Sequence, residues 1–135
     1  MNVLIDTSIW SLVLRRNKSL NQNVEIRKVV EELIEEFRVQ MVGPIRQEIL
    51  SGITNKGQFL KLLEILQSFE DLTLNTSDYE RAAEMFNICR KKGIQGSHVD
   101  FVICAAAERY QLTIFTLDAD FQHYAKHLPI RLFQT

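Results

Sequence analysis

Four carboxylates in this 135-residue chain stand in or beside hydrophobic sequence: Asp6, Glu48, Asp100 and Asp118. Asp6 follows the apolar run VLI and Asp118 follows TIFTL, with Asp120 two residues further on. Asp100 lies in VDFVICAAA, where every other residue is apolar, and such a segment is typical of a buried helix. Because an unpaired buried charge costs several kcal/mol or more, Asp100 must be neutral, paired or bound to a metal.

Each of these acids also has an ordinary structural interpretation. Asp6 or Asp118 could cap the N-terminus of a following helix, a position that Asp favours. Asp100 could be the acidic arm of a capping box that begins at Ser97. Glu48 could be a solvated helix residue, although the spacing puts it beside an apolar helix face. Taken one at a time, these carboxylates do not decide between a structural and a chemical role.

Taken together, the acids favour a divalent cation. Two like charges about 4 Å apart repel by about 4 kcal/mol at an effective dielectric constant near 20, so a cluster needs a cation or protonation. Oxygen ligands without clustered Cys or His suit Mg²⁺ or Mn²⁺ better than Zn²⁺. His123 and His127 have the i, i+4 spacing of a zinc pair, but no third ligand is marked nearby, and we expect both to face solvent.

Composition excludes several classes of protein. The chain has 16 Lys and Arg against 17 Asp and Glu, a net charge of −1, which argues against a polyanion binder that relies on charge alone. We find no apolar run of about 18 residues and no signal peptide, so we expect neither a membrane span nor secretion. Cys89 and Cys104 fall in apolar helical patterns and are expected to be buried thiols in a reducing cytoplasm.

Short strands alternate with longer amphipathic helices along the chain. The expected strands are Val3–Ile5, Val39–Val42, Leu72–Leu74, Thr113–Leu117 and Ile130–Phe133. Such alternation predicts an α/β sandwich: a mainly parallel sheet of about five strands, flanked by helices, in a single domain over residues 1–135. Open α/β sheets bind ligands at the carboxyl ends of their strands, which is where Asp6 and Asp118 fall.

Helical periodicity marks the elements between the strands. Three apolar stripes are predicted: Ile26, Val29, Val30, Leu33 and Phe37; Phe59, Leu62, Leu63 and Leu66; and Tyr79, Ala82, Ala83 and Phe86. We expect the third helix to open with a capping box from Ser77 to Glu80 and to stop at Gly93. Pro44 suits the first turn of a helix that ends before Gly52.

Four motifs, in order and with their spacing intact, resemble the PIN-domain ribonucleases, and most closely the VapC toxins of toxin–antitoxin pairs. These motifs are VLIDTSIW at 3–10, EILSG at 48–52, GSHVDFVICAAA at 96–107 and TLDADF at 116–121. The resemblance implies a parallel sheet between helices and an Mg²⁺- or Mn²⁺-dependent endoribonuclease. It further implies a homodimer in the cytoplasm that is inhibited by a cognate antitoxin.

Motif by motif, the resemblance also assigns roles. Asp6, Glu48, Asp100 and Asp118 match the acidic quartet of the family, and Asp120 matches an additional acid that many members have. We expect Asp6, Asp100 and Asp118 to ligate the metal, Glu48 to orient or activate water, and Asp120 to assist. The hydroxyl residues Thr7, Ser8 and Thr116, together with Arg46, are the expected substrate-binding residues.

Other cationic residues could contact RNA phosphates or could simply be solvated: Arg15, Arg16, Lys18, Arg90, Lys91 and Lys92. Two rival functions stay open. An aspartyl phosphatase also has an Asp after its first strand, but typically has a second Asp at the position of Ser8. A non-catalytic, protein-binding PIN-like domain would lack a working metal site, which the complete acidic pattern disfavours.

Overall fold

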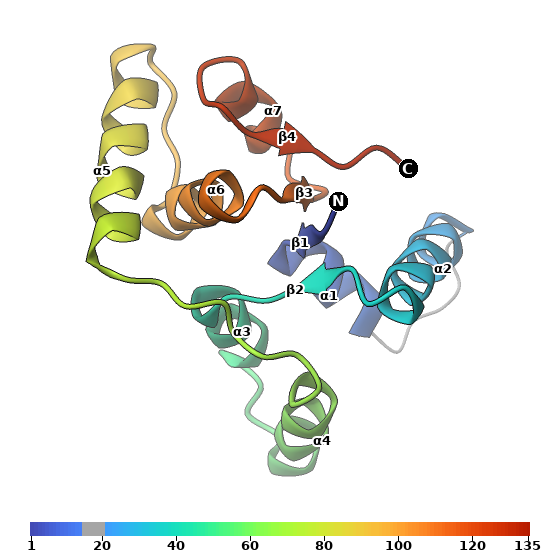
Figure 1. Cartoon of the computed structure of the whole chain (residues 1–135). Helices are drawn as coiled ribbons and strands as arrows, with labels where there is room; N and C mark the ends of the chain where they lie inside the picture. Colours follow the sequence, from blue (N-terminus) through green and yellow to red (C-terminus); the bar gives the residue numbers. More distant parts are fainter. Residues whose placement is uncertain (15–20) are drawn as a thin grey trace.

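A computed structural model describes residues 1–14 and 21–135 of the chain. Its described part contains one parallel sheet of four strands in the order β2-β1-β3-β4 (Figure 1). The strands are β1 (Val3–Ile5), β2 (Val39–Gln40), β3 (Thr113–Phe115) and β4 (Arg131–Leu132). In the centre of the sheet, Val3 pairs with Thr113 and Ile5 with Phe115, so β1 and β3 end side by side. The α/β architecture expected from the sequence is confirmed.

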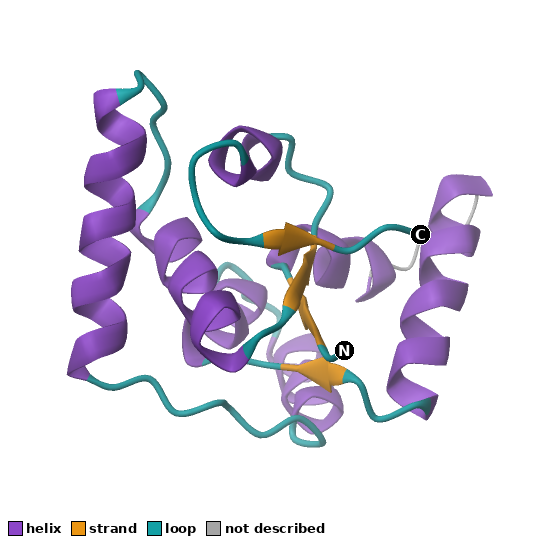
Figure 2. Cartoon of the chain, turned by 45° about the horizontal axis from the view of Figure 1, so that its top comes forward, coloured by secondary structure: helices purple, strands orange, loops and turns teal. Residues whose placement is uncertain are grey.

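Helices lie on both sides of this sheet. They are α1 (Thr7–Leu14), α2 (Asn21–Glu35), α3 (Gly43–Leu50), α4 (Lys56–Leu66), α5 (Thr76–Lys91), α6 (His98–Tyr110) and α7 (Asp120–Ala125). Figure 2 shows α5 and α6 to one side of the strands and α2 to the other. As expected, Pro44 lies in the first turn of α3, and Gly93, just after α5, has a left-handed φ of 74°.

The core is built around β1 and α6. All three residues of β1 are buried, as is the run from Phe101 to Ala107 in α6. Because α6 is apolar all round, neighbouring elements must cover every face of the helix after its first turn. Asp100 is therefore held at the N-terminal end of a fixed, central helix, where Ser97 caps the helix by accepting from the Asp100 amide at 3.1 Å.

β1 has the expected bounds, whereas β2, β3 and β4 are shorter than the sequence suggested and Leu72–Leu74 is not a strand. At that place a single parallel bridge joins Met41 to Asp71, and the Leu72 amide donates to the Met41 carbonyl at 2.8 Å. The side chains at 72–74 alternate between half-buried and exposed, which suits a covering segment as well as an edge strand. β3 likewise ends at Phe115, and the chain then turns to bring Thr116 toward β1.

Two helix expectations were wrong in detail. Phe37 does not extend the buried stripe of α2: it follows the helix with a left-handed φ of 57°, and its side chain is 89% exposed. The capping box of α5 is formed by Asn75 and Asp78, not by Ser77 and Glu80. The residues of α5 that are buried are Asp78, Ala82, Met85 and Cys89, whereas Tyr79 is about half exposed, so the buried face differs from the expected apolar stripe.

Two simpler expectations can be compared with the same structure. Cys89 and Cys104 are free and buried, and burial raises the pKa of both thiols, as inert structural cysteines require. Across the described residues we find no helix that combines the length and hydrophobicity needed to cross a bilayer. The single-domain organisation over 1–135 stays a prediction.

Candidate metal centre

The carboxyl ends of β1 and β3 form the floor of the candidate site. Asp6 directly follows β1, and its amide donates to the carbonyl of Phe115, the last residue of β3, at 2.9 Å. The connections from β1 and from β3 lead to opposite edges of the sheet, since β2 flanks β1 and β4 flanks β3. Such a point of reversal is where open α/β sheets form ligand-binding crevices.

Three carboxylates converge there from different elements. Asp100 comes from the first turn of α6, Asp118 from the loop after β3 and Asp120 from the start of α7. One oxygen from each lies within 4.8 Å of the others; we call these residues the acidic cluster. The Asp118 carboxylate also accepts from the Asp120 amide at 2.9 Å, which fixes the loop that carries both acids.

Asp6 lies beneath this cluster and is only 6% exposed. Its Oδ2 accepts from the Ser8 hydroxyl at 2.9 Å and from the Thr116 hydroxyl at 2.8 Å. The same two hydroxyl oxygens accept backbone amides from the loop after β3: Leu117 donates to Ser8 at 3.0 Å and Asp118 donates to Thr116 at 2.9 Å. Ser8 and Thr116 thus join the loops that carry Asp6 and Asp118.

Glu48 is not a member of the acidic cluster and, like Asp120, is exposed. It lies on α3, and its carboxylate accepts from the Thr7 hydroxyl at 2.7 Å. This bond links α3 to the start of α1, next to Asp6. Of the hydroxyls expected to bind substrate, Thr7, Ser8 and Thr116 all donate to site carboxylates, and their contribution is therefore to hold these acids in place.

Burial raises the pKa of Asp100, and the negative charges of Asp118 and Asp6 raise it further. Hydrogen bonds from Tyr124 and Ser97 act in the opposite direction. Tyr124 is fully buried, its hydroxyl lies 2.7 Å from Asp100 Oδ2, and burial together with that carboxylate raises the pKa of the phenol. The phenol therefore keeps its proton near neutral pH and is the donor in this bond.

The described part of the chain provides no Arg or Lys ion pair for the site acids, although buried acids usually have one. Among residues 1–14 and 21–135, Arg and Lys form ion pairs with Glu36, Asp71, Asp78, Glu84 and Glu108, and with none of the site acids. Hydroxyls and one phenol are their hydrogen-bond donors instead. A set of hard carboxylate oxygens, close together and without a positive partner, fits Mg²⁺ or Mn²⁺.

The cluster differs from the ligand set expected from the sequence. We expected Asp6, Asp100 and Asp118 as ligands, with Asp120 assisting; the structure instead brings Asp120 together with Asp100 and Asp118. Asp6 lies near enough for its charge to act on Asp100, but its Oδ2 is already engaged by two hydroxyls. That Asp6 ligates the metal, directly or through water, stays a prediction.

Arg46 has a structural role that the sequence did not reveal. Its guanidinium forms an ion pair with Asp71 at 2.9 Å and donates to the backbone carbonyls of Leu66 and Phe69. It therefore fastens the segment after α4 onto α3 and is not free to bind an RNA phosphate in this arrangement. Arg15, Arg16 and Lys18 lie outside the described residues, whereas Arg90, Lys91 and Lys92 are exposed at the end of α5.

The histidines do not extend the metal centre. His123 and His127 are both exposed, as expected, and no third ligand gathers with them within the described part of the chain. His98 stacks on Phe86, with ring centroids 5.2 Å apart and planes 16° from parallel. Tyr124, in contrast, is a site residue that the sequence analysis missed. Its burial in α7, which means that its hydroxyl needs a partner, is seen only in the structure.

Comparisons with known proteins agree with this geometry. The PIN domain family model matches residues 3–127. A VapC ribonuclease of Mycobacterium bovis, Mb1587, is 32% identical over 126 residues, which cover 92% of each chain. The fold matches FitAcB from Neisseria gonorrhoeae with a TM-score of 0.77 and 21% identity, covering 98% of this chain and 96% of that one. VapBC2 from Rickettsia felis, bound to a promoter DNA fragment, matches with a TM-score of 0.73 and 19% identity, covering 98% of each.

The family match spans the acids at the ends of β1 and β3, the helix that carries Asp100 and the hydroxyls that hold Asp6. The family model thus matches most of the chain, and the curated relative covers 92% of it. The chain belongs to the PIN domain family.

Proposed function

We propose that this protein is the toxin of a type II toxin–antitoxin pair: an endoribonuclease that hydrolyses RNA with the help of Mg²⁺ or Mn²⁺. The observation that carries the proposal is the acidic cluster, which gathers Asp100, Asp118 and Asp120 and has no ion pair with an Arg or Lys of residues 1–14 and 21–135. A relative named as a ribonuclease, similar over 92% of both chains, supports the reaction class. Membership of the PIN family supports the fold that such an enzyme needs.

In this mechanism, Asp100, Asp118 and Asp120 would hold the cation, with Asp6 beside them. When bound, the cation lowers the pKa of a water molecule and neutralises charge that develops on the scissile phosphate. Ser8 and Thr116 keep the Asp6 carboxylate in a fixed orientation, and Thr7 does the same for Glu48. We infer that Glu48, which is exposed and accepts a hydrogen bond from Thr7, orients or activates the attacking water.

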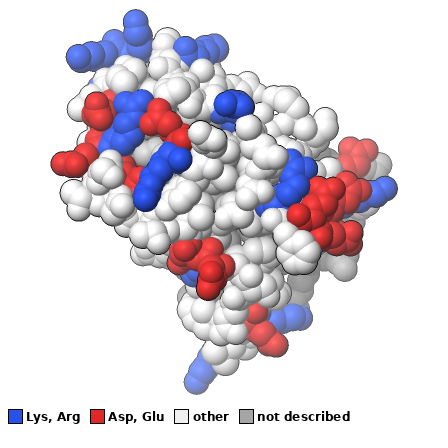
Figure 3. All heavy atoms as spheres, in the orientation of Figure 1, with Lys and Arg blue, Asp and Glu red and all other residues white. Residues whose placement is uncertain are grey.

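The distribution of charge on the surface bears on how RNA would be attracted to the site. On the face drawn in Figure 3, Lys and Arg side chains are interspersed with Asp and Glu, and the described residues there form no continuous basic band. With a net charge of −1, RNA must be attracted by a few local cations and by the bound metal. Arg90, Lys91 and Lys92 are exposed candidates for the local contacts.

The remaining parts of the proposal concern partners and place. We infer a cognate antitoxin as the inhibitor, a homodimer as the working form and the cytoplasm as the location. The fold neighbour from Rickettsia felis is a VapBC2 assembly, which supports a protein partner of the antitoxin kind. The rival function is a PIN domain that binds proteins and does not cut RNA, which would have no use for a cation at the acidic cluster.

The test is cleavage of total cellular RNA by the purified protein, with EDTA, Mg²⁺ or Mn²⁺, beside Asp6→Asn. The variant keeps an oxygen for the Ser8 and Thr116 hydroxyls, so it should fold and lose activity. Asp71→Asn, an exposed acid paired with Arg46, is the matched control and should cut normally. We expect discrete fragments that require metal; equal cleavage by Asp6→Asn, or cleavage in EDTA, would contradict the proposal.

A further inference from the structure

Tyr124 connects the C-terminal helix to the acidic cluster. It lies on α7 and is 0% exposed, and its hydroxyl donates to Asp100 Oδ2 at 2.7 Å across 24 residues of sequence. The ring is held between aromatic neighbours: its centroid is 4.9 Å from that of Phe101 and 5.1 Å from that of Phe121. The hydroxyl therefore has little freedom to leave the carboxylate.

Gly96 makes room for this hydroxyl. A Cβ at position 96 would overlap the Tyr124 hydroxyl oxygen, and it would lie 2.8 Å from the Cζ of that ring and 2.9 Å from a ring carbon of Phe101. Real Cβ atoms do not approach so closely, and the atoms that would have to move belong to a packed aromatic pair. The absence of a side chain at Gly96 is thus a condition for the bond from Tyr124 to Asp100.

We propose that Tyr124, admitted by Gly96, is a positioning residue that sets the orientation of the Asp100 carboxylate for a divalent cation. The terminal torsion of an Asp side chain is broad and roughly two-fold, so a carboxylate without a partner samples many orientations. The phenol fixes that torsion and occupies one acceptor site on Oδ2, which leaves the remaining lone pairs for the cation. This inference rests on the proposed function, because it presupposes that the acidic cluster binds a metal.

A second tyrosine, Tyr110, forms a hydrogen bond that has only a structural role. Tyr110, at the end of α6, donates its hydroxyl to the backbone carbonyl of Thr73 at 2.5 Å. That bond satisfies a half-buried phenol and a backbone acceptor far from the cluster. A buried Tyr124 could have been satisfied in the same way by a carbonyl, but its partner is the carboxylate of Asp100, an acid of the cluster.

The experiment measures Mn²⁺ binding directly, from the signal of free Mn²⁺ in electron paramagnetic resonance, without RNA. The chains to compare are the full-length wild type, Tyr124→Phe, Gly96→Ala and Tyr110→Phe. Partners that orient a metal ligand typically change affinity by about 10- to 100-fold, so we expect the dissociation constant to rise by that factor in Tyr124→Phe and Gly96→Ala. Tyr110→Phe, which also loses one phenol hydrogen bond, should bind Mn²⁺ as the wild type does.

A thermal melt in EDTA separates positioning from folding. Tyr110→Phe and Tyr124→Phe should each be somewhat less stable, yet only Tyr124→Phe should lose Mn²⁺ affinity. Equal Mn²⁺ affinity of Tyr124→Phe and the wild type would overturn the positioning role and leave the proposed function intact, even if Gly96→Ala does not fold. Failure of the wild type itself to bind Mn²⁺ would overturn both this role and the metal site on which the proposed function depends.

Discussion

The acidic residues near the two ends of helix α6 differ in whether a cationic side chain pairs with them. At the C-terminal end, Glu108 pairs with Arg81 and Asp78 pairs with Arg109. At the N-terminal end, Asp100 lies close to Asp118 and Asp120, where a phenol donates to Asp100 and a backbone amide donates to Asp118. Within the described residues, the helix thus separates acids that are paired with arginine from acids that are not.

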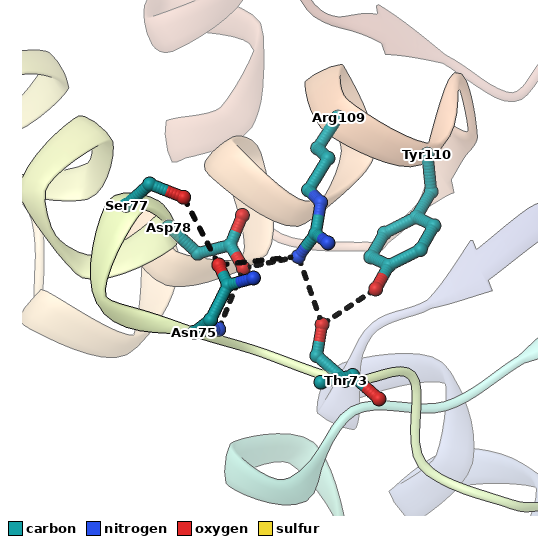
Figure 4. A network of polar contacts seen from close by, with 6 residues as sticks. All are labelled: Thr73, Asn75, Ser77, Asp78, Arg109 and Tyr110. Carbon is teal, nitrogen blue, oxygen red and sulfur yellow. Dashed lines mark hydrogen bonds and ion pairs between the residues drawn. The ribbon is translucent and has the colours of Figure 1, made fainter.

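Figure 4 shows the paired end. Arg109 lies 2.5 Å from the buried Asp78, and the same nitrogen donates to the Thr73 carbonyl at 3.1 Å. The backbone N–H of Asn75 also donates to the Asp78 carboxylate at 2.8 Å, which completes the capping box of α5. A single arginine from α6 therefore fixes both the start of α5 and the segment that precedes it.

The two ends of α6 also differ in the pKa shifts of their carboxyl groups, which are those of Glu108 and Asp100. Arg81 donates two hydrogen bonds to Glu108, at 2.8 and 3.0 Å, and these lower the pKa of that carboxyl. Burial and neighbouring acids raise the pKa of Asp100. Folding therefore favours the charged form of Glu108 and disfavours the charged form of Asp100. We interpret the pair of Glu108 with Arg81 as an interaction that stabilises the fold. We interpret the unfavourable surroundings of the charged Asp100 as those of a carboxylate that binds a cation.

The largest predicted effect comes from removing the charge at the unpaired end. Asp100→Asn should lower RNA cleavage by about 10²-fold or more, since it removes one of three clustered ligand carboxylates. In EDTA near neutral pH the variant should be more stable than the wild type by a few °C, because a like charge has been removed. Single-turnover cleavage and thermal melts check the two effects together.

The pH dependence of that stability difference follows from the sign of the shift. Because folding raises the pKa of Asp100, this carboxyl favours the folded state below its ordinary value of 3.8 and loses that contribution as pH rises through the raised pKa. The advantage of Asp100→Asn should therefore be present at neutral pH and shrink in acid. A less stable variant at neutral pH would show that the comparison between the two ends is wrong.

At the paired end, Arg109→Leu should reduce stability and spare chemistry. It leaves the 4% exposed Asp78 with its backbone donor but without a cation. Breaking a buried pair on one side costs about 3–5 kcal/mol, and because Arg109 is itself partly exposed we expect about 2–3 kcal/mol. Urea unfolding measures this, and adding Asp78→Leu to the same chain should restore part of the loss.

The hydroxyls that hold Asp6 should have an intermediate effect. Thr116→Val removes the 2.8 Å bond to Asp6 and the acceptor for the Asp118 amide while keeping the shape of the side chain. We expect cleavage to fall by about 10-fold, in the range found when partners of metal ligands are removed. Thr113→Val is the control in the same strand region and should cut normally, because the Thr113 hydroxyl has no hydrogen-bond partner among the described residues.

The smallest predicted effect is that of Glu108→Gln. This partly exposed pair with Arg81 should contribute about 0.5 kcal/mol at neutral pH. Because folding lowers the pKa of Glu108, the contribution is present above its ordinary value of 4.5 and is lost as pH falls through the lowered pKa. The stability difference between wild type and variant, followed by urea unfolding across pH, should vanish in acid; an equal difference at all pH values would assign it to packing.

Much of the fold was accessible from sequence because it depends on local patterns. The apolar runs of β1 and α6, Pro44 at the start of α3 and Gly93 after α5 all mark elements that the structure confirms. Errors arose where one polar residue shifted a boundary. Asn75, two residues before Ser77, is the N-cap of α5, and the buried face of this helix is decided by its packing and not by the position of its cap.

The sequence predicted the kind of site, a group of carboxylates that binds a cation, but not the contacts that hold these carboxylates in place. The acids at strand ends indicated where a cation would bind, because parallel strands bring their carboxyl ends together. Three features depend on long-range packing that no local pattern encodes: the bond from Tyr124 to Asp100, the space at Gly96 and the use of Arg46 as a structural clamp. The grouping of Asp120 with Asp100 also depends on how α7 begins, which the sequence left open.

The most direct test of the central claim is a crystal structure of the protein grown with Mn²⁺, with anomalous diffraction to locate the ion. We predict an anomalous peak within about 2.2 Å of carboxylate oxygens of Asp100, Asp118 and Asp120, and none beside Asp78 or Glu108. A peak that avoids the cluster, or well-ordered site carboxylates without any peak at saturating Mn²⁺, would contradict the account.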